Sequence, residues 1–295
     1  MVPPSGRQFS LRHGDQRTVL VEVGGGIREY SVGDRVVLDG YPVGEMADGG
    51  RGQPLLPWPN RIRDGRYHFN GSDLQLPINE AEHSNAIHGL TRWSNWTATE
   101  VSDKRVTLML LVYPQPGYPF SLLLAIEYEL GGDGLTVTTR AVNVGTEPLP
   151  FGAGYHPYLA PAGSLDETEL LVPAARRLQF DERQLPTGAL ADVAGTAYDF
   201  RSPRALGDLR IDACFTGLDR EGGTARVRAG RTTLWMDSSF THLMVFTGDT
   251  LAPERRRRGL AVEPMTCPPD AFNSGKDVHV LQPRESFVAR WGISP

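Results

Sequence analysis

The sequence predicts an all-β protein, folded as a large antiparallel β-sandwich. Short runs of alternating or β-rich residues recur along the chain, with Gly, Asp or Pro between them. The 33 Gly and 23 Pro among 295 residues suit the many turns that such a fold needs. Helical periodicity is scarce, since Asp181–Gln184 and Ser202–Leu206 could hold at most a turn or two. These observations favour a sandwich over alternating strands and helices.

The expected strands are distributed over the whole chain. No fixed-period repeat and no linker is visible, so one domain over residues 1–295 is expected. The region 44–85 is the least strand-like and is rich in Gly, Pro, Asn and Asp, which predicts long loops of the kind that carry functional sites. The clearest strand-like runs are 17–26, 30–40, 105–114, 121–134, 135–145, 232–239, 242–249 and 286–293.

Composition limits the classes of function. Hydrophobic residues make up 40% and charged residues 22% of the chain, which allows a sizeable core. The formal charge of −5 argues against nucleic acid or an anionic membrane as the main partner. The N-terminal segment lacks a signal-peptide layout, and no apolar run is long enough to span a bilayer. A soluble, cytoplasmic protein is therefore expected, with its oligomeric state left open.

Several motifs carry little functional information. The GGG at 24–26 lacks phosphate-loop spacing and predicts a turn, and ERRRR at 254–258 predicts a solvated loop. The spacing of His83 and His88 does not favour a shared metal, so no metal is expected. Cys214 and Cys267 could form one disulfide, and the sequence leaves their pairing open.

The stretch FGAGYHPYL, residues 151–159, places a histidine on an otherwise glycine face. If the stretch is a strand, His156 shares one face with Gly152 and Gly154, while the opposite face suits a core. The glycines could leave room for a ligand, or His156 could be a core residue with one hydrogen-bond partner. Pro157 biases His156 towards an extended conformation and is expected to end the strand.

The stretch GLAVEP, residues 259–264, repeats this design with a glutamate. Glu263 would share a face with the small residues Gly259 and Ala261, and Pro264 follows it as Pro157 follows the histidine. A carboxylate buried at a strand end is costly unless it is paired or functional. The two segments together indicate an acid–base pair facing one cavity.

Three further segments offer polar side chains. PWPNRIRDG at 57–65 presents Asn60 and Arg61, where the arginine could orient a polyhydroxyl ligand or simply pair with Asp64 at the surface. In NAIHGL, His88 is followed at once by Gly89, and if the stretch is a strand His88 shares a face with the small residues Ser84 and Ala86. Asp212 precedes an apolar pair in DACF and is not informative alone.

In these segments the chain resembles the aldose 1-epimerase (galactose mutarotase-like) family. The resemblance rests on six pieces that occur in the family's order over about residues 57–273. They are NRI with a following glycine-containing strand at 60–71, IHG at 87–89, GYHPYL at 154–159, DACF at 212–215, VFTGD at 245–249 and AVEPMTCPPDAFN at 261–273.

The resemblance implies a β-supersandwich with a sugar cleft, and interconversion of the α and β anomers of an aldohexose. It implies Glu263 as general base and His156 as general acid, with His88 near the ring oxygen or a neighbouring hydroxyl. Arg61, Asp212 and Asn60 would bind the sugar. Opening a pyranose requires one proton removed from the C1 hydroxyl and one delivered to the ring oxygen, which a carboxylate and an imidazole can do without a cofactor.

One difference between this sequence and the family's usual pattern bears on the substrate. After IHG, Leu90-Thr91-Arg92 stands where the galactose enzymes usually carry a second glycine. That pattern is closer to the hexose-6-phosphate 1-epimerase branch, so Arg92 is a candidate phosphate or specificity residue, although GYHPYL is more typical of enzymes for unphosphorylated sugars. The sequence is also compatible with a glycoside hydrolase that uses Glu263 and Asp212 as its two carboxylates, and with a non-catalytic sugar-binding protein.

Overall fold

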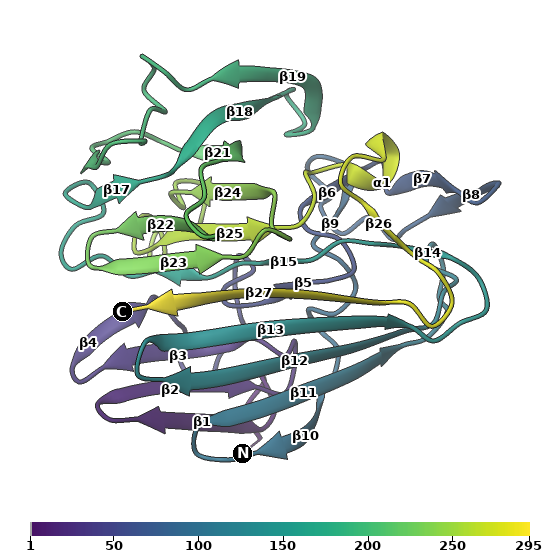
Figure 1. Cartoon of the computed structure of the whole chain (residues 1–295), viewed down its shortest axis with the longest axis horizontal. Coiled ribbons are helices and arrows are strands. Elements are labelled where there is room, and N and C mark those ends of the chain that lie inside the picture. The colour runs from purple at the N-terminus through teal and green to yellow at the C-terminus, as the bar shows by residue number, and fades with distance from the viewer. Residues whose placement is uncertain (1) are drawn as a thin grey trace.

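The fold is nearly all β, as the sequence predicts. The computed structural model describes residues 2–295, in which two large antiparallel sheets pack face to face and three two-stranded hairpins or ribbons extend from them (Figure 1). The one helix among these residues is the short α1 (Ala271–Ser274), which the sequence analysis did not anticipate.

The first sheet has twelve strands and contains every strand that lines the site described below, apart from a small ribbon. Its central strands pair antiparallel, with β25 between β24 on one side and β15 and β16 on the other. In spatial order its main path is β1 (Gln8–His13), β2 (Gln16–Val21), β3 (Ile27–Val32), β4 (Arg35–Leu38), β16 (Tyr158–Leu159), β25 (Leu260–Met265), β24 (His242–Phe246), β21 (Asp212–Leu218), β18 (Ala174–Phe180) and β19 (Pro186–Asp192), with β15 (Gly154–Tyr155) and β5 (Pro54–Leu55) off this path.

The second sheet has nine strands, and its long members lie over β1 to β4 in Figure 1. In spatial order they are β10 (Thr97–Val101), β11 (Arg105–Val112), β12 (Leu122–Gly131), β13 (Gly134–Asn143), β27 (Ser286–Ser294), β23 (Thr232–Met236), β22 (Ala225–Ala229), β17 (Glu169–Leu171) and β20 (Arg204–Ala205). The two-stranded pairs are β14 (Leu149–Phe151) with β26 (His279–Leu281), β6 (Arg61–Arg63) with β9 (Asn85–Ile87), and β7 (Arg66–Phe69) with β8 (Ser72–Gln75).

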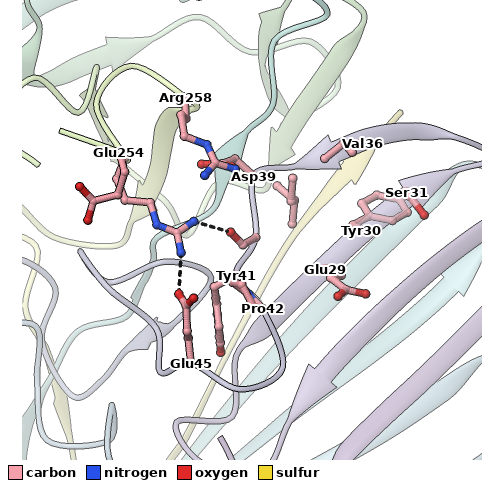
Figure 2. A pocket seen from close by; sticks show the side chains of 13 residues that line it. Glu29, Tyr30, Ser31, Val36, Asp39, Tyr41, Pro42, Glu45, Glu254 and Arg258 are labelled. Carbon is pink, nitrogen blue, oxygen red and sulfur yellow. Dashed lines mark hydrogen bonds and ion pairs between the residues drawn. The ribbon is translucent and has the colours of Figure 1, made fainter. Parts of the chain in front are cut away.

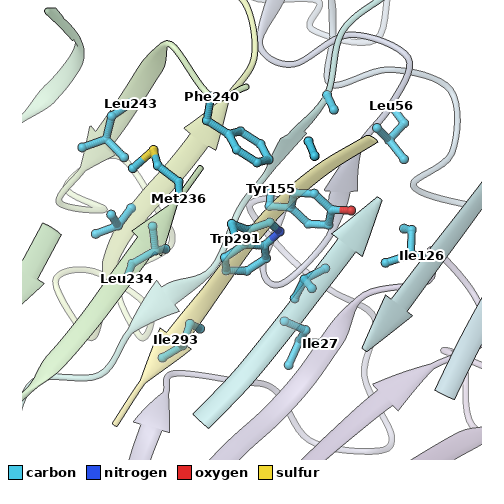
Figure 3. Packing of buried hydrophobic residues seen from close by; sticks show 14 of the residues in the cluster. Ile27, Leu56, Ile126, Tyr155, Leu234, Met236, Phe240, Leu243, Trp291 and Ile293 are labelled. Carbon is cyan, nitrogen blue, oxygen red and sulfur yellow. The ribbon is translucent and has the colours of Figure 1, made fainter. Parts of the chain in front are cut away.

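The core lies between the two sheets, and it fixes the position of the chain around residue 155. Side chains alternate between buried and more exposed along β12, because successive residues of a strand point to opposite faces. Tyr155 reaches into this core, where its ring centroid lies 4.9 Å from that of Trp291 (Figure 3). Its hydroxyl shares a hydrogen bond with Thr139. The residue after Tyr155 therefore faces away from the core.

The expectation for residues 44–85 was too coarse. This region contains the short strands β5, β6, β7 and β8, so it is not continuous loop. β7 and β8 form a hairpin, whereas β6 pairs with β9 and β5 pairs with β15. Short strands flanked by turn residues offer too little periodicity to be distinguished from loop.

A single strand from Phe151 that ends before Pro157 was expected in FGAGYHPYL, and this was wrong. The stretch is divided into β14, β15 and β16, and Gly152 and Gly154 do not face a ligand space. A Cβ at Gly152 would lie 2.5 Å from Sγ of Cys267, and one at Gly154 would lie 2.6 Å from Cβ of Pro59. These glycines allow close packing of the protein against itself.

Two further features concern the cysteines and the helices. Cys214 and Cys267 are both buried and unpaired. In the part of the chain that the structure describes, no helix has the length and apolar character needed to cross a membrane.

Candidate active site

All seven candidate residues from the sequence line one cavity of about 280 Å³. This volume is close to the lower end of the range for ligand pockets, about 300 Å³, and suits a ligand the size of a single sugar ring. The cavity lies where β25, β24 and β21 meet the ribbon of β6 and β9. The seven are Asn60, Arg61, His88, Arg92, His156, Asp212 and Glu263.

His156 and Glu263 face each other in this cavity. His156 follows β15 directly, so its ring points away from the core that holds Tyr155. Its Nε2 lies 3.3 Å from Oε1 of Glu263, and the two residues are only 5% and 2% exposed. This places an imidazole and a carboxylate within proton-transfer reach of each other and of any ligand beside them.

Glu263 does not stand at a strand end, contrary to expectation. β25 continues through Pro264 to Met265, and Glu263 pairs with Met244 in the neighbouring β24. Pro264 has no N–H to donate, and the strand tolerates it because the neighbouring strand is interrupted there, between β15 and β16. The N–H of Val262 on one side of it donates to the carbonyl of Pro157, and the N–H of Thr266 on the other side donates to the carbonyl of Ala153.

Burial drives both groups of the pair towards their uncharged forms. It raises the pKa of Glu263 well above the usual value, and the neighbouring Asp212 carboxylate adds to the effect while Arg61 opposes it. Burial, together with the positive charges of Arg92 and Arg51, lowers the pKa of His156 to about 3. The pair therefore resists both full protonation and full ionisation.

His88 lies against His156 from a second direction. It follows β9 rather than belonging to it, in a left-handed conformation with φ of 63°. The rings of His88 and His156 meet edge to face with centroids 5.4 Å apart. Nδ1 of His88 accepts the backbone N–H of Asn60 at 3.3 Å, and burial keeps the pKa of His88 well below normal. A neutral imidazole that accepts at Nδ1 carries its proton on Nε2, so His88 can donate a hydrogen bond to a ligand.

Arg61 is held by a carboxylate that the sequence analysis missed. Its Nε and Nη2 donate to both oxygens of Glu80 at 2.7–2.9 Å. Although burial opposes the effect, these bonds lower the pKa of Glu80. The proposed surface pairing of Arg61 with Asp64 is therefore wrong, since Asp64 pairs with Arg183 instead. Glu80 could not be found from sequence because it reaches Arg61 only through the pairing of β6 with β9.

Arg92 and Asp212 occupy other parts of the cavity wall. Nε of Arg92 donates to Oε1 of Gln53 at 2.9 Å, and its guanidinium lies 5.5 Å from the ring centroid of the exposed Trp93. Asp212 begins β21 at the exposed edge of the cavity. The surrounding wall nevertheless raises its pKa by desolvation, against the attraction of Arg61.

Nine further residues line the cavity without having been singled out. Among these, Tyr158 and Gly50 contact the histidine. The Tyr158 ring stacks on the His156 ring, and a Cβ built on Gly50 would lie 2.6 Å from Cδ2 of His156. The nine are Gly49, Gly50, Glu80, Ile87, Tyr158, Met244, Phe246, Thr250 and Leu251.

Replacing Gly50 by Ala is expected to displace the imidazole of His156 and to lower kcat by about 10-fold or more for any reaction in which that imidazole takes part, because small misplacements of a reacting group are costly. Gly33→Ala is the matched control. Gly33 also has a positive φ, of 54°, but nothing lies within 4 Å of its Cβ position. Steady-state kinetics of both folded variants test this, and equal activities would contradict it.

A larger cavity of about 690 Å³ lies elsewhere, over β3 and β4 (Figure 2). It contains none of the seven candidate residues. Its wall includes Asp39, beside which Figure 2 shows Arg258. Arg258 belongs to the run ERRRR, which is not uniformly solvated as expected, since Arg255 and Arg257 are largely buried and form ion pairs with Glu45 and Asp166.

Comparison with known proteins decides the family. The sequence profile described as aldose 1-epimerase matches residues 7–294. The chain belongs to the aldose 1-epimerase family. Among its relatives, YihR of Escherichia coli K12, described as uncharacterized, is 37% identical over 282 residues, covering 94% of this chain and 90% of YihR. The galactose mutarotase of Rattus norvegicus is 35% identical over 153 residues, which span 50% of this chain and 44% of that enzyme.

Solved structures support the fold. A GalM/aldose epimerase homologue from C. elegans superposes with a TM-score of 0.87 at 17% identity, covering 98% of both chains. A structure described as a putative aldose 1-epimerase from Escherichia coli K12 gives a TM-score of 0.83 at 23% identity, again covering 98% of both chains. These neighbours establish the galactose mutarotase-like fold of the family.

Proposed function

We propose that this protein is an aldose 1-epimerase that interconverts the α and β anomers of an aldohexose by acid–base ring opening and closure. The observation that carries the proposal is the contact of 3.3 Å between Nε2 of His156 and Oε1 of Glu263 inside a small polar cavity. Family membership supports it, and no relative's activity is needed for the chemical argument.

The reaction needs one base and one acid. Glu263 takes the proton from the C1 hydroxyl while His156 gives a proton to the ring oxygen. The bond between C1 and the ring oxygen breaks as a carbonyl forms at C1. Rotation about the C1–C2 bond turns the other face of the carbonyl towards the oxygen, and closure returns both protons. Protons and electrons balance without a cofactor.

The pair can supply both roles because it holds one proton. A protonated Glu263 beside a neutral His156 contains the same proton as an ionised Glu263 beside a protonated His156, and the contact allows the two forms to interconvert. Burial favours the first form at rest. The ionised form is the one that opens the ring, and sugar hydroxyls entering the cavity would help to stabilise it.

Arg61, His88, Asn60 and Asp212 are proposed to bind the hydroxyls of the sugar. Arg61 keeps its orientation through Glu80, and His88 keeps its donor on Nε2 through the bond to the Asn60 backbone. Asp212 provides an acceptor at the exposed edge of the cavity. Donors and acceptors thus surround the ring on several sides, as recognition of a polyhydroxyl ligand requires.

The pH dependence of kcat/KM follows from the one-proton pair. The pair gains a second proton only as pH falls towards the His156 pKa of about 3, so activity is expected to persist well below pH 6. The pair loses its only proton above the raised pKa of Glu263, so activity is expected to fall on the alkaline side. An acid limb near the ordinary histidine value of about 6.5 would contradict this.

A second candidate function is a hexose-6-phosphate 1-epimerase, which Arg92 favours. This guanidinium lines the cavity with Gln53 as its hydrogen-bonding partner and forms no ion pair with any residue of the described part of the chain. It could therefore receive an anionic substituent.

Polarimetry on freshly dissolved α-glucose, α-galactose and glucose 6-phosphate tests both functions. Faster mutarotation of an unphosphorylated sugar supports the first, and a strong preference for glucose 6-phosphate that Arg92→Gln abolishes supports the second. Release of free sugar from a glycoside would indicate a hydrolase. Calorimetric binding without any rate enhancement would indicate a sugar-binding protein, and would overturn the proposal.

A further inference from the structure

The segment from Asp48 to Gln53 packs against His156 along its backbone and its ring. The N–H of His156 donates to the carbonyl of Gln53 at 3.1 Å, and the N–H of Gly52 donates to the carbonyl of His156 at 2.9 Å. Gly50 lies against the ring, as described above. The position of His156 thus depends on this segment as well as on the sheet.

Arg51, at the centre of the segment, is a charged side chain in an unusually buried place. It is 1% exposed, although arginine is almost never fully buried unless it is paired. Its Nη1 lies 2.6 Å from Oδ2 of Asp39, and its Nε lies 3.1 Å from Oδ1 of Asp48. The two carboxylates fix the plane of the guanidinium.

The fixed guanidinium lies against Tyr158. The Cζ atom of Arg51 is 4.1 Å from the centroid of the tyrosine ring. That ring in turn stacks on His156 with an interplanar angle of 13° and a centroid distance of 5.0 Å. The hydroxyl of Tyr158 donates to the carbonyl of Gly49 at 3.0 Å, which ties the ring back to the same segment. Packed contacts therefore lead continuously from Asp39 to the imidazole.

We propose that Arg51 is a positioning residue, which holds Tyr158 flat against His156 and so fixes where Nε2 of His156 lies relative to Glu263. This role rests on the proposed epimerase function, and it gives a buried, doubly paired arginine a task that stability alone does not require. Replacing a buried ion pair by apolar residues is often neutral or stabilising, so such pairs are weak evidence for stability.

Arg51 also acts on the charge of His156. Two cations, Arg51 and Arg92, face the imidazole and oppose its protonation. The other groups around it are Glu263, His88 and Tyr158. Of these, only Glu263 can supply a negative charge in the ordinary pH range. Removing one of the two cations should therefore make protonation of His156 easier.

The test combines kinetics with NMR of ¹⁵N-labelled histidine. Arg51→Lys keeps the charge and loses the planar fork, so kcat is expected to fall about 10-fold or more. KM is expected to stay within about twofold, because Arg51 does not line the cavity. Arg51→Met removes the charge, and the titration midpoint of His156 is expected to rise by about one pH unit or more.

Arg258→Lys is the matched control. Arg258 also pairs with Asp39, with Nη2 2.9 Å from Oδ1, but it is half exposed and lines the larger cavity beside that carboxylate (Figure 2). Its replacement should leave kcat and the His156 signals unchanged. A double-mutant cycle with Tyr158→Leu tests whether Arg51 acts through the tyrosine ring. Once that ring is removed, Arg51→Lys should lower kcat little further.

The proposal is overturned if folded Arg51→Lys and Arg51→Met keep the wild-type kcat and the wild-type His156 signals, or if the Arg51 and Tyr158 effects simply add. Should both Arg51 variants fail to fold, Asp39→Asn, which removes one of the two carboxylates orienting Arg51, is expected to show the same fall in kcat, and wild-type kinetics there would overturn the proposal. Because the NMR measurement does not depend on turnover, it still tests Arg51 if the wild-type protein proves to have no epimerase activity.

Discussion

Glu263→Gln is expected to lower kcat for anomer interconversion by at least about 10²-fold while leaving the fold intact. Glutamine has nearly the same shape as glutamate but cannot take the proton of the C1 hydroxyl. Steady-state polarimetry or a dehydrogenase-coupled assay measures the loss. Activity close to wild type would remove Glu263 from the mechanism.

The same substitution makes a stability prediction with a definite sign. A carboxyl whose pKa is raised on folding costs stability at every pH above its unfolded value of about 4.3, because the folded protein holds its proton more tightly than the unfolded chain. Glutamine has no such charge. At pH 8 the variant should therefore unfold at the same temperature as the wild type or a higher one, which thermal denaturation can measure. A strongly destabilised variant would indicate that Glu263 serves the fold instead.

His156→Gln removes the second member of the acid–base pair and is expected to lower kcat by about 10²–10⁴-fold. His242→Asn is the matched control. His242 is also almost fully buried and burial also lowers its pKa, to about 4, but it does not line the cavity. The control should keep most of its activity per folded molecule.

The double variant distinguishes a cooperating pair from two independent groups. If Glu263 and His156 share one proton, removing both should cost little more than removing the more damaging one alone. Losses that multiply would contradict the shared-proton mechanism, even if both single variants were inactive.

The sequence predicts the sheets well because their signal is local. Alternation of side chains along 105–114, 121–134 and 135–145 is enough to anticipate β11, β12 and β13, which are successive neighbours in the nine-stranded sheet. The site residues could be anticipated partly from proline-braced ionisable groups and partly from family resemblance, and all seven line one cavity.

The reasons behind two of those predictions were nevertheless incorrect. Gly152 and Gly154 were expected to make room for a ligand, but Cys267 and Pro59 fill that space, because tertiary contacts decide what approaches a glycine. Pro264 was expected to end a strand, but β25 continues through it since the neighbouring strand is interrupted there. Alternation along one strand contains no information about its neighbours.

The supporting residues could not be anticipated for a related reason. Glu80 reaches Arg61 from 19 positions away, and Arg51 reaches Asp39 from 12 positions away. Glu80 and Arg51 both stand in the loop-rich region 44–85, where a solvated side chain is the ordinary expectation. Only the folded arrangement brings Glu80 to the cavity wall and Arg51 against Tyr158.

The most direct test of the central claim is two-dimensional exchange NMR of the anomeric protons of glucose and galactose at equilibrium, with the wild-type protein and with Glu263→Gln. The method detects conversion between anomers without any net reaction. The account predicts cross-peaks between the α and β protons of at least one sugar, growing with wild-type concentration and reduced to the uncatalysed level by Glu263→Gln. Cross-peaks of equal strength with the two proteins, or none above the uncatalysed level with the wild type for either sugar, would contradict it.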